Sequence, residues 1–222
     1  MIDEASKTGY VRVSRFGANT AKEMNAALDS LKAAGMKQLI LDLSDNGGGY
    51  LNSAVEMANE FLDKNQTIVY TEGRNWERSD ATAKGNGKYK KMNLVVVVNQ
   101  YSASAAEILT GAIQDWDRGV VVGRRTFGKG LVQRPFQFED GSMIRLTTAR
   151  YHTPSGRCIQ KPYTKGDKAT YEHDIEMRYK AGEFYHRDSI KVDEKLRFST
   201  LRQGRTIYGG GGIIPDVFVP LD

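Results

Sequence analysis

Residues 93–107 read NLVVVVNQYSASAAE, and this stretch contains the two features that decide the fold. The run from Asn93 to Val98 is apolar and rich in β-branched side chains, which is typical of a strand buried on both faces of a parallel sheet. Small residues follow, and Ser104 stands three positions before Glu107, which is the capping pattern of a helix start. The stretch therefore predicts a buried strand that turns sharply into a helix beginning near residue 104.

Strand and helix patterns alternate on both sides of this stretch. Further strands are predicted at residues 9–13, 38–43, 66–70 and 120–122, a hairpin with its turn at Asp140–Gly141, and a closing edge strand at 213–219. Capping patterns at Thr20 and Ser53 predict helices between the first strands. Because helices alternate with strands, we expect an α/β fold with a mostly parallel sheet. One domain, residues 1–222, is expected, with residues 160–205 as a charged surface insertion.

Composition excludes several classes of function. The net charge of +5 is mild, and no basic run is interleaved with aromatic residues, so we expect no nucleic-acid partner. No apolar run approaches the roughly 18 residues of a membrane span. Cys158 is the only cysteine, which leaves no internal disulfide, and no histidine stands near it that would make it a nucleophile. The three histidines do not cluster with carboxylates at metal spacing, so no metal site and no cofactor are predicted.

Ser104 has two interpretations from the residues alone. It caps the predicted helix, or it is a nucleophile whose oxyanion is stabilised by the free amides at a helix N-terminus, with the Ala105 N–H best placed. Ser102 is a competing serine, which a turn would also explain. A Ser-His-Asp arrangement stays open, although no histidine is tied to either serine by a pattern.

Lys129 stands between two glycines, Gly128 and Gly130, with apolar residues on both sides. Such a segment is expected to pack inward, where burial disfavours the ammonium form and lowers the pKa of a lysine. A neutral amine is a competent base for a serine hydroxyl. Gln133, four residues later, is a candidate to hold this amine in place without adding charge.

The glycine run at residues 47–49 follows a predicted strand and precedes a predicted helix. It lacks the spacing of the known phosphate-binding glycine loops, so a nucleotide site is weakly supported. The other use of such glycines is close approach of the backbone to a substrate. An amide of this loop is then a second candidate oxyanion donor.

Four segments together resemble the catalytic core of the carboxyl-terminal processing proteases, also called tail-specific proteases, which are Ser-Lys peptidases. They are residues 39–49, 102–107, 126–133 and 210–216. The resemblance implies a crotonase-like β-β-α spiral core with the charged insertion and a C-terminal edge strand. It also implies Ser104 as nucleophile, Lys129 and Gln133 as its partners, and Gly48 and Ala105 as oxyanion donors, with Gly49 as a rival to Gly48.

The resemblance implies a serine endopeptidase that cleaves polypeptides near their carboxyl-terminal tails without a cofactor. It implies an extracytoplasmic, membrane-proximal setting in a bacterial periplasm or cell envelope, with the targeting segment and the family's usual PDZ domain outside this chain. Oligomeric state does not follow from it. Two alternatives stay open: a non-catalytic module that binds a ligand or a protein tail on the same fold, and acyl-CoA chemistry on a crotonase-like scaffold.

Overall fold

The core of the molecule is a five-stranded sheet in which every neighbouring pair of strands is parallel. The computed structural model describes residues 1–222. The strands lie in the order β1 (Thr8–Arg12), β2 (Gln38–Asp42), β5 (Asn93–Val98), β6 (Val120–Gly123) and β11 (Val217–Phe218). The apolar runs predicted as buried strands therefore form this sheet, and the predicted closing edge strand is β11. The mixed α/β class is confirmed, whereas the crotonase-like spiral stays a prediction.

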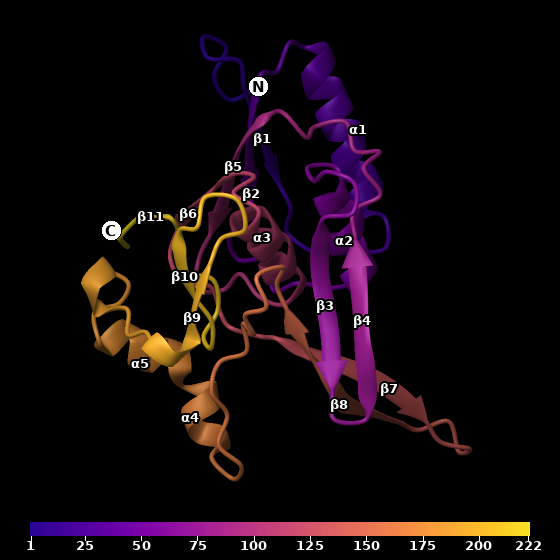
Figure 1. Cartoon of the computed structure of the whole chain (residues 1–222), viewed down its shortest axis with the longest axis vertical. Helices are drawn as coiled ribbons and strands as arrows, with labels where there is room; N and C mark the ends of the chain where they lie inside the picture. Colours follow the sequence, from indigo (N-terminus) through magenta and orange to yellow (C-terminus); the bar gives the residue numbers. More distant parts are fainter.

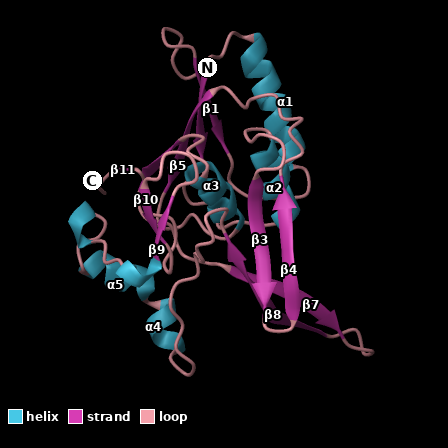
Figure 2. Ribbon diagram, viewed as in Figure 1, coloured by secondary structure: helices cyan, strands magenta, loops and turns pink.

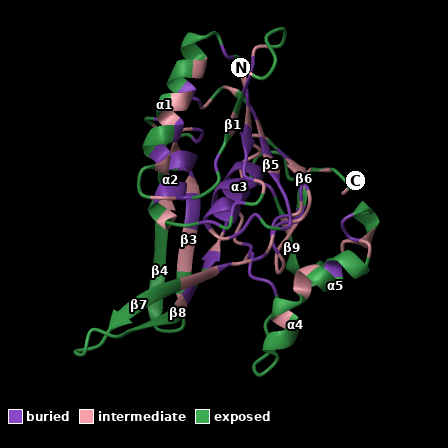
Figure 3. Ribbon diagram, turned by 180° about the vertical axis from the view of Figure 1, so that it is seen from behind, coloured by how far each residue is buried: buried purple, intermediate pink, exposed green.

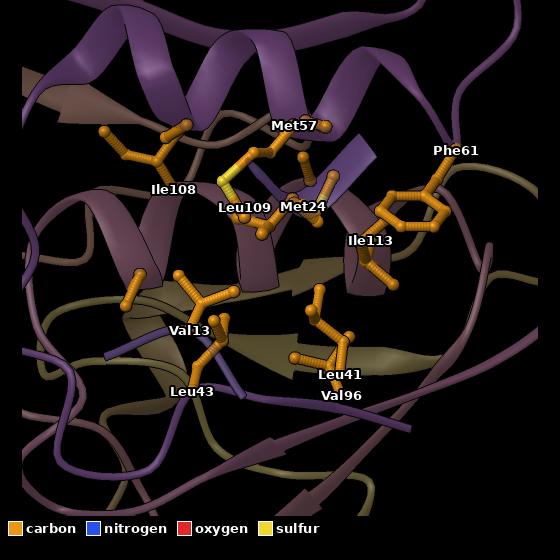
Figure 4. Packing of buried hydrophobic residues seen from close by; sticks show 14 of the residues in the cluster. Val13, Met24, Leu41, Leu43, Met57, Phe61, Val96, Ile108, Leu109 and Ile113 are labelled. Atoms are coloured by element: carbon orange, nitrogen blue, oxygen red, sulfur yellow. The ribbon is translucent and has the colours of Figure 1, made fainter. Parts of the chain in front are cut away.

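Three helices complete the core: α1 (Thr20–Ala33), α2 (Leu51–Asn59) and α3 (Ala105–Asp115). Every residue of α3 is buried, which is unusual for a helix and explains its apolar and small residues. Figure 4 shows Ile108, Leu109 and Ile113 of this helix between side chains of the sheet and those of α1 and α2. Because α3 is enclosed in this way, its first turn is held in one position.

A second, antiparallel sheet has the order β4 (Trp76–Thr82), β3 (Thr67–Gly73), β8 (Met143–His152) and β7 (Leu131–Gln137). The β7–β8 hairpin extends away from the body of the molecule (Figures 1 and 3). Phe136 pairs with Ile144 across the hairpin, and both side chains are exposed. Leu146 on β8 and Phe138, the residue that follows β7, are exposed as well.

The chain between residues 160 and 205 forms short elements beside the sheet's β6–β11 edge (Figure 2). They are α4 (Lys168–Glu172), α5 (Asp174–Lys180), two 3₁₀ turns (Arg187–Ser189 and Glu194–Leu196) and β9 (Arg197–Ser199), which pairs with β10 (Thr206–Tyr208). Most of this segment is exposed, but Lys161, Arg178 and Glu183 are buried. No helix of the structure is both long and apolar enough to cross a membrane.

Both capping patterns near the N-terminus are wrong in detail. Helix α1 has Asn19 at its N-cap, and the Thr20 hydroxyl instead donates to Arg15 O at 3.0 Å. Helix α2 begins at Leu51, so Ser53 lies inside it as a buried residue. Both helices are present where they were predicted, and their N-cap residues lie one and three positions before the predicted ones.

Candidate active site

Ser104 is the N-cap residue of α3, at the corner where the buried strand β5 has turned into the helix. Its backbone has φ 56° and ψ −113°, a conformation that L-residues rarely adopt. Strained backbone of this kind costs about 1–3 kcal/mol and persists only where the surroundings enforce it. Ser104 is half-buried, so its side chain stays accessible at this corner.

Ser102, the competing serine, has a structural role. It is fully buried, its hydroxyl donates to Leu43 O at 2.7 Å, and the same oxygen accepts the Asn99 N–H at 3.0 Å. These contacts join the β5–α3 turn to the end of β2. A hydroxyl that is enclosed and used twice is unsuited to attack a substrate, which favours Ser104.

Glu107 connects the turn that contains Ser104 to the segment that contains Lys129. Its carboxylate is fully buried and accepts the Ser104 N–H at 2.9 Å and the Lys129 N–H at 2.8 Å on the same oxygen, Oε2. The other oxygen accepts the Thr126 hydroxyl and the Gly128 N–H, each at 2.6 Å. Burial raises the pKa of Glu107, and these four donors oppose that shift by stabilising the carboxylate.

Lys129 lies in residues 125–130, which we call the base segment after the role that the sequence predicts for this lysine. A further hydrogen bond ties the segment to the turn that contains Ser104: the Phe127 N–H donates to Ser102 O at 3.0 Å. The Lys129 side chain is half-buried rather than enclosed, and its amine makes no hydrogen bond or ion pair within the protein. No hydrogen bond joins this amine to the Ser104 hydroxyl, although the shared oxygen of Glu107 brings the two backbones together.

The glycine loop lies directly against Ser104. A Cβ added to Gly48, which has φ +95°, would lie 2.8 Å from Ser104 Cβ and 2.9 Å from Ala105 N. The Gly48 N–H donates to Asn46 Oδ1 at 2.8 Å, and the buried Asn46 side chain is itself anchored to Val13 O. The Ala105 N–H and the Gly49 N–H have no acceptor in the protein.

The remaining candidates make no hydrogen bond with Ser104. Gln133 lies on β7, opposite Thr147, with an exposed side chain that makes no hydrogen bond. His152 stacks on Tyr70 at 4.7 Å between ring centroids and faces Gly156 O through Nδ1. Burial raises the pKa of the Cys158 thiol, which disfavours the reactive thiolate. No group of histidine, cysteine and carboxylate side chains in the structure is arranged to hold a metal ion.

Sequence reasoning assigned Glu107 to a local capping box and missed that it holds the base segment. The same pattern, a serine three residues before a glutamate, was the available signal. It predicts the hydrogen bond from the Ser104 N–H, but not the three donors contributed by residues 126–129. The role of Asn46 in ordering the glycine loop had no signal beyond its position before the glycines.

A strained serine at a helix N-terminus, a lysine segment tied to it and a glycine loop against the serine form a site suited to acyl transfer. Comparison with known proteins identifies the family of this chain. Residues 7–170 match the model of peptidase family S41. The chain belongs to this family.

Three S41-related proteins illustrate the similarity. A carboxyl-terminal-processing protease of Synechocystis sp. is 45% identical over 153 residues, which are 69% of this chain and 35% of that protein. A probable CtpA-like serine protease of Staphylococcus aureus is 34% identical over 205 residues, 91% of this chain and 41% of that protein. The solved structure of a photosystem II D1 C-terminal processing protease superposes with a TM-score of 0.69 and 30% identity, covering 96% of this chain and 42% of that one.

This S41 chain therefore spans less than half the length of these relatives. The solved structure covers almost all of the chain, which includes the elements between residues 160 and 205 as well as the parallel sheet. Family membership gives this chain the fold of an S41 peptidase over residues 7–170.

Proposed function

We propose that this chain is the catalytic core of a serine endopeptidase that cleaves polypeptides near their carboxyl termini. The observation that supports it most strongly is the Glu107 carboxylate, one oxygen of which accepts the backbone N–H of both Ser104 and Lys129. A buried carboxylate that joins these two positions gives a serine and a lysine from distant parts of the chain a fixed separation. A scaffold without chemistry has no need of this link.

In the proposed reaction, Ser104 Oγ attacks the carbonyl carbon of the scissile peptide bond and its proton passes to Lys129 Nζ. The new oxyanion accepts from the Ala105 N–H, which has no other acceptor, and from an amide of the glycine loop. Collapse of this intermediate breaks the C–N bond, and the leaving amine takes the proton from Lys129. Water then attacks the acyl carbon, and its proton passes to Lys129; when the Ser104 Oγ–acyl bond breaks, Lys129 returns this proton to Ser104 Oγ.

The Lys129 amine must turn toward Ser104 for this chemistry. It has no partner to give up, because it makes no hydrogen bond or ion pair in the protein. Hydrogen bonds between catalytic groups are often long in free enzymes and shorten when substrate is bound. We propose that the Gly48 N–H is the oxyanion donor of the loop, for which it would have to leave Asn46, and Gly49 is the alternative donor. We propose that Gln133 orients Lys129 when substrate is bound.

Substrate and setting are part of the proposal. We propose polypeptide tails as substrates and an extracytoplasmic, membrane-proximal location, as the resemblance to tail-specific proteases implies. No cofactor is required, since the nucleophile, base and oxyanion donors are all supplied by the chain.

The test measures cleavage of an unstructured peptide by mass spectrometry, with the same peptide amidated at its carboxyl terminus as a comparison. Ser104→Ala should abolish cleavage, and Lys129→Arg should lower kcat by about two to four orders of magnitude, because arginine keeps the charge but cannot act as a base. Lys22→Ala, an exposed position on α1, is the matched control. Unchanged turnover in either active-site variant would refute the assignment, and peptide binding without turnover in the wild type would favour a binding module.

A further inference from the structure

The two glycines beside Lys129 allow a second backbone segment to pack against the base segment. The Gly130 N–H donates to Gln160 Oε1 and the Lys161 N–H donates to Gly128 O, both at 2.9 Å. A Cβ on Gly130 would lie 2.8 Å from Gln160 N, and a Cβ on Gly128 would lie 3.1 Å from Lys161 Cβ. The glycines are therefore needed for this close approach, and residues 160–161 fix the base segment immediately around its lysine.

Arg178, on helix α5, holds the other end of the base segment. Its side chain is buried, with 5% of its surface exposed. Nη1 donates to Thr126 O at 3.0 Å and Nη2 donates to Arg125 O at 2.6 Å. A guanidinium is planar and rigid, so binding two consecutive carbonyls with its two ends fixes the peptide planes that lead into Lys129.

Glu183 balances the charge of this contact. Its buried carboxylate accepts from Arg178 Nε and from Arg125 Nε, each at 2.8 Å. Asp174 adds a second carboxylate, 3.8 Å from Arg178 Nη1 and 3.3 Å from the buried amine of Lys161. Four charged residues of the 160–205 segment, namely Lys161, Asp174, Arg178 and Glu183, are thus directed inward, and Arg178 meets the backbone of the base segment.

This arrangement differs from ordinary packing. Burying a guanidinium is unfavourable unless it is paired and fully hydrogen-bonded, and an apolar side chain would fill the same volume without that penalty. What an apolar residue cannot do is determine the orientation of two backbone carbonyls. Arg178 fixes the start of the base segment, while Glu107 fixes the amides of Gly128 and Lys129.

We propose that Arg178 is a positioning residue that sets the placement of Lys129, acting through the carbonyls of Arg125 and Thr126. The inference rests on the proposed peptidase function for its meaning, and it gives the segment between residues 160 and 205 a role in the active site. Arg178 itself touches neither Ser104 nor the Lys129 amine.

The first test compares Arg178→Met and Arg178→Lys with Lys180→Met, an exposed position on the same helix. Both Arg178 variants lose the two-carbonyl contact, while Arg178→Lys keeps the charge beside Glu183. We expect kcat to fall about a hundredfold with KM changed less than about twofold, since misplacing a reacting group by a small distance has effects of that size.

The second test does not depend on turnover. Lysines are labelled by reductive ¹³C-methylation, the Lys129 signal is assigned with Lys129→Arg, and its chemical shift is compared between the variants at one pH. A Lys129 signal that is displaced in both Arg178 variants, and unchanged in Lys180→Met, supports positioning even if the wild-type chain cleaves no peptide. If the Arg178 variants only melt at a lower temperature and the Lys129 signal does not move, the proposal is overturned. Should Arg178→Met fail to fold, Arg178→Lys alone decides.

Discussion

Asp115 and Arg157 form an ion pair of 2.7 Å in which neither side chain is exposed to solvent. Asp115 is the last residue of α3, the helix that begins next to Ser104. Arg157 also donates to Gln114 Oε1 at 2.7 Å and to Tyr208 O at 3.0 Å, so the pair joins the end of this helix to strand β10. The end of α3 farthest from Ser104 is therefore fixed by buried charge.

Removing one partner should be strongly destabilising. Arg157→Leu leaves the Asp115 carboxylate buried without its cation, and we expect the free energy of unfolding to fall by about 3–5 kcal/mol. Arg12→Leu is the control, because Arg12 pairs with Asp45 at the surface and such pairs contribute about 1 kcal/mol or less. Urea unfolding followed by circular dichroism measures both. Equal losses in the two variants would mean that burial of the pair is not what matters.

Glu107→Gln tests the hydrogen bonds through which Glu107 joins the turn that contains Ser104 to the base segment. Each oxygen of the carboxylate accepts two donors, and an amide replaces one of these acceptors with an NH₂ group that faces N–H or O–H donors. We expect kcat to fall about a hundredfold through misplacement of Lys129. Steady-state kinetics with the tail peptide measure this, and Glu56→Gln on α2 is the control. Wild-type kcat in Glu107→Gln would contradict the assigned role.

The glycine loop offers a matched pair of substitutions. Gly48→Ala introduces a Cβ 2.7 Å from Ala103 O at a position with φ +95°, so we expect loss of cleavage together with lower thermal stability. Gly47→Ala introduces a Cβ with nothing within 4 Å, so this variant should retain both properties. Peptide cleavage and thermal melts separate the two outcomes. An active Gly48→Ala enzyme would show that the loop is not held against Ser104.

Cys158 should be inert. Burial raises the pKa of its thiol, so the folded chain keeps it protonated at pH values where the unfolded chain ionises it. This contribution to stability is present below the unfolded pKa and is lost as the pH rises through the folded pKa. Because the thiolate is the reactive form, alkylation by iodoacetamide at about pH 8 should be slower in the folded chain than in urea. Equal rates would contradict this, and Cys158→Ala should cleave as the wild type does.

Much of the fold was predictable because its signals are local. The apolar run at Asn93–Val98 and the small residues after it predict a strand and a helix from their own pattern, and the structure has β5 and α3 there. The position of Ser104 at the corner between strand and helix follows from the same stretch, whereas its positive φ does not. Ser53 shows the opposite case, because helix α2 begins at Leu51 and Ser53 lies buried inside it.

The site was less predictable because its contacts join distant segments. Arg178 binds the carbonyls of residues 125 and 126. The sequence does not indicate these partners, because every residue carries a backbone carbonyl. Gln133 is instructive in another way. Its spacing of four residues from Lys129 suggests that the two side chains lie close together. An extended strand, however, advances about 3.3 Å per residue, and Gln133 lies on β7 with its side chain in solvent. Its role as a partner of Lys129 stays a prediction.

The backbone of Ser104 has a consequence for anyone who evolves this protein. Its φ of 56° suits glycine far better than serine, so Ser104→Gly should relieve strain while Ser104→Ala should not. A screen for heat resistance alone would then enrich glycine at position 104 and yield more heat-stable proteins that lack the Ser104 hydroxyl. Robustness and chemistry are opposed at this one residue, and any directed-evolution scheme has to select for both together.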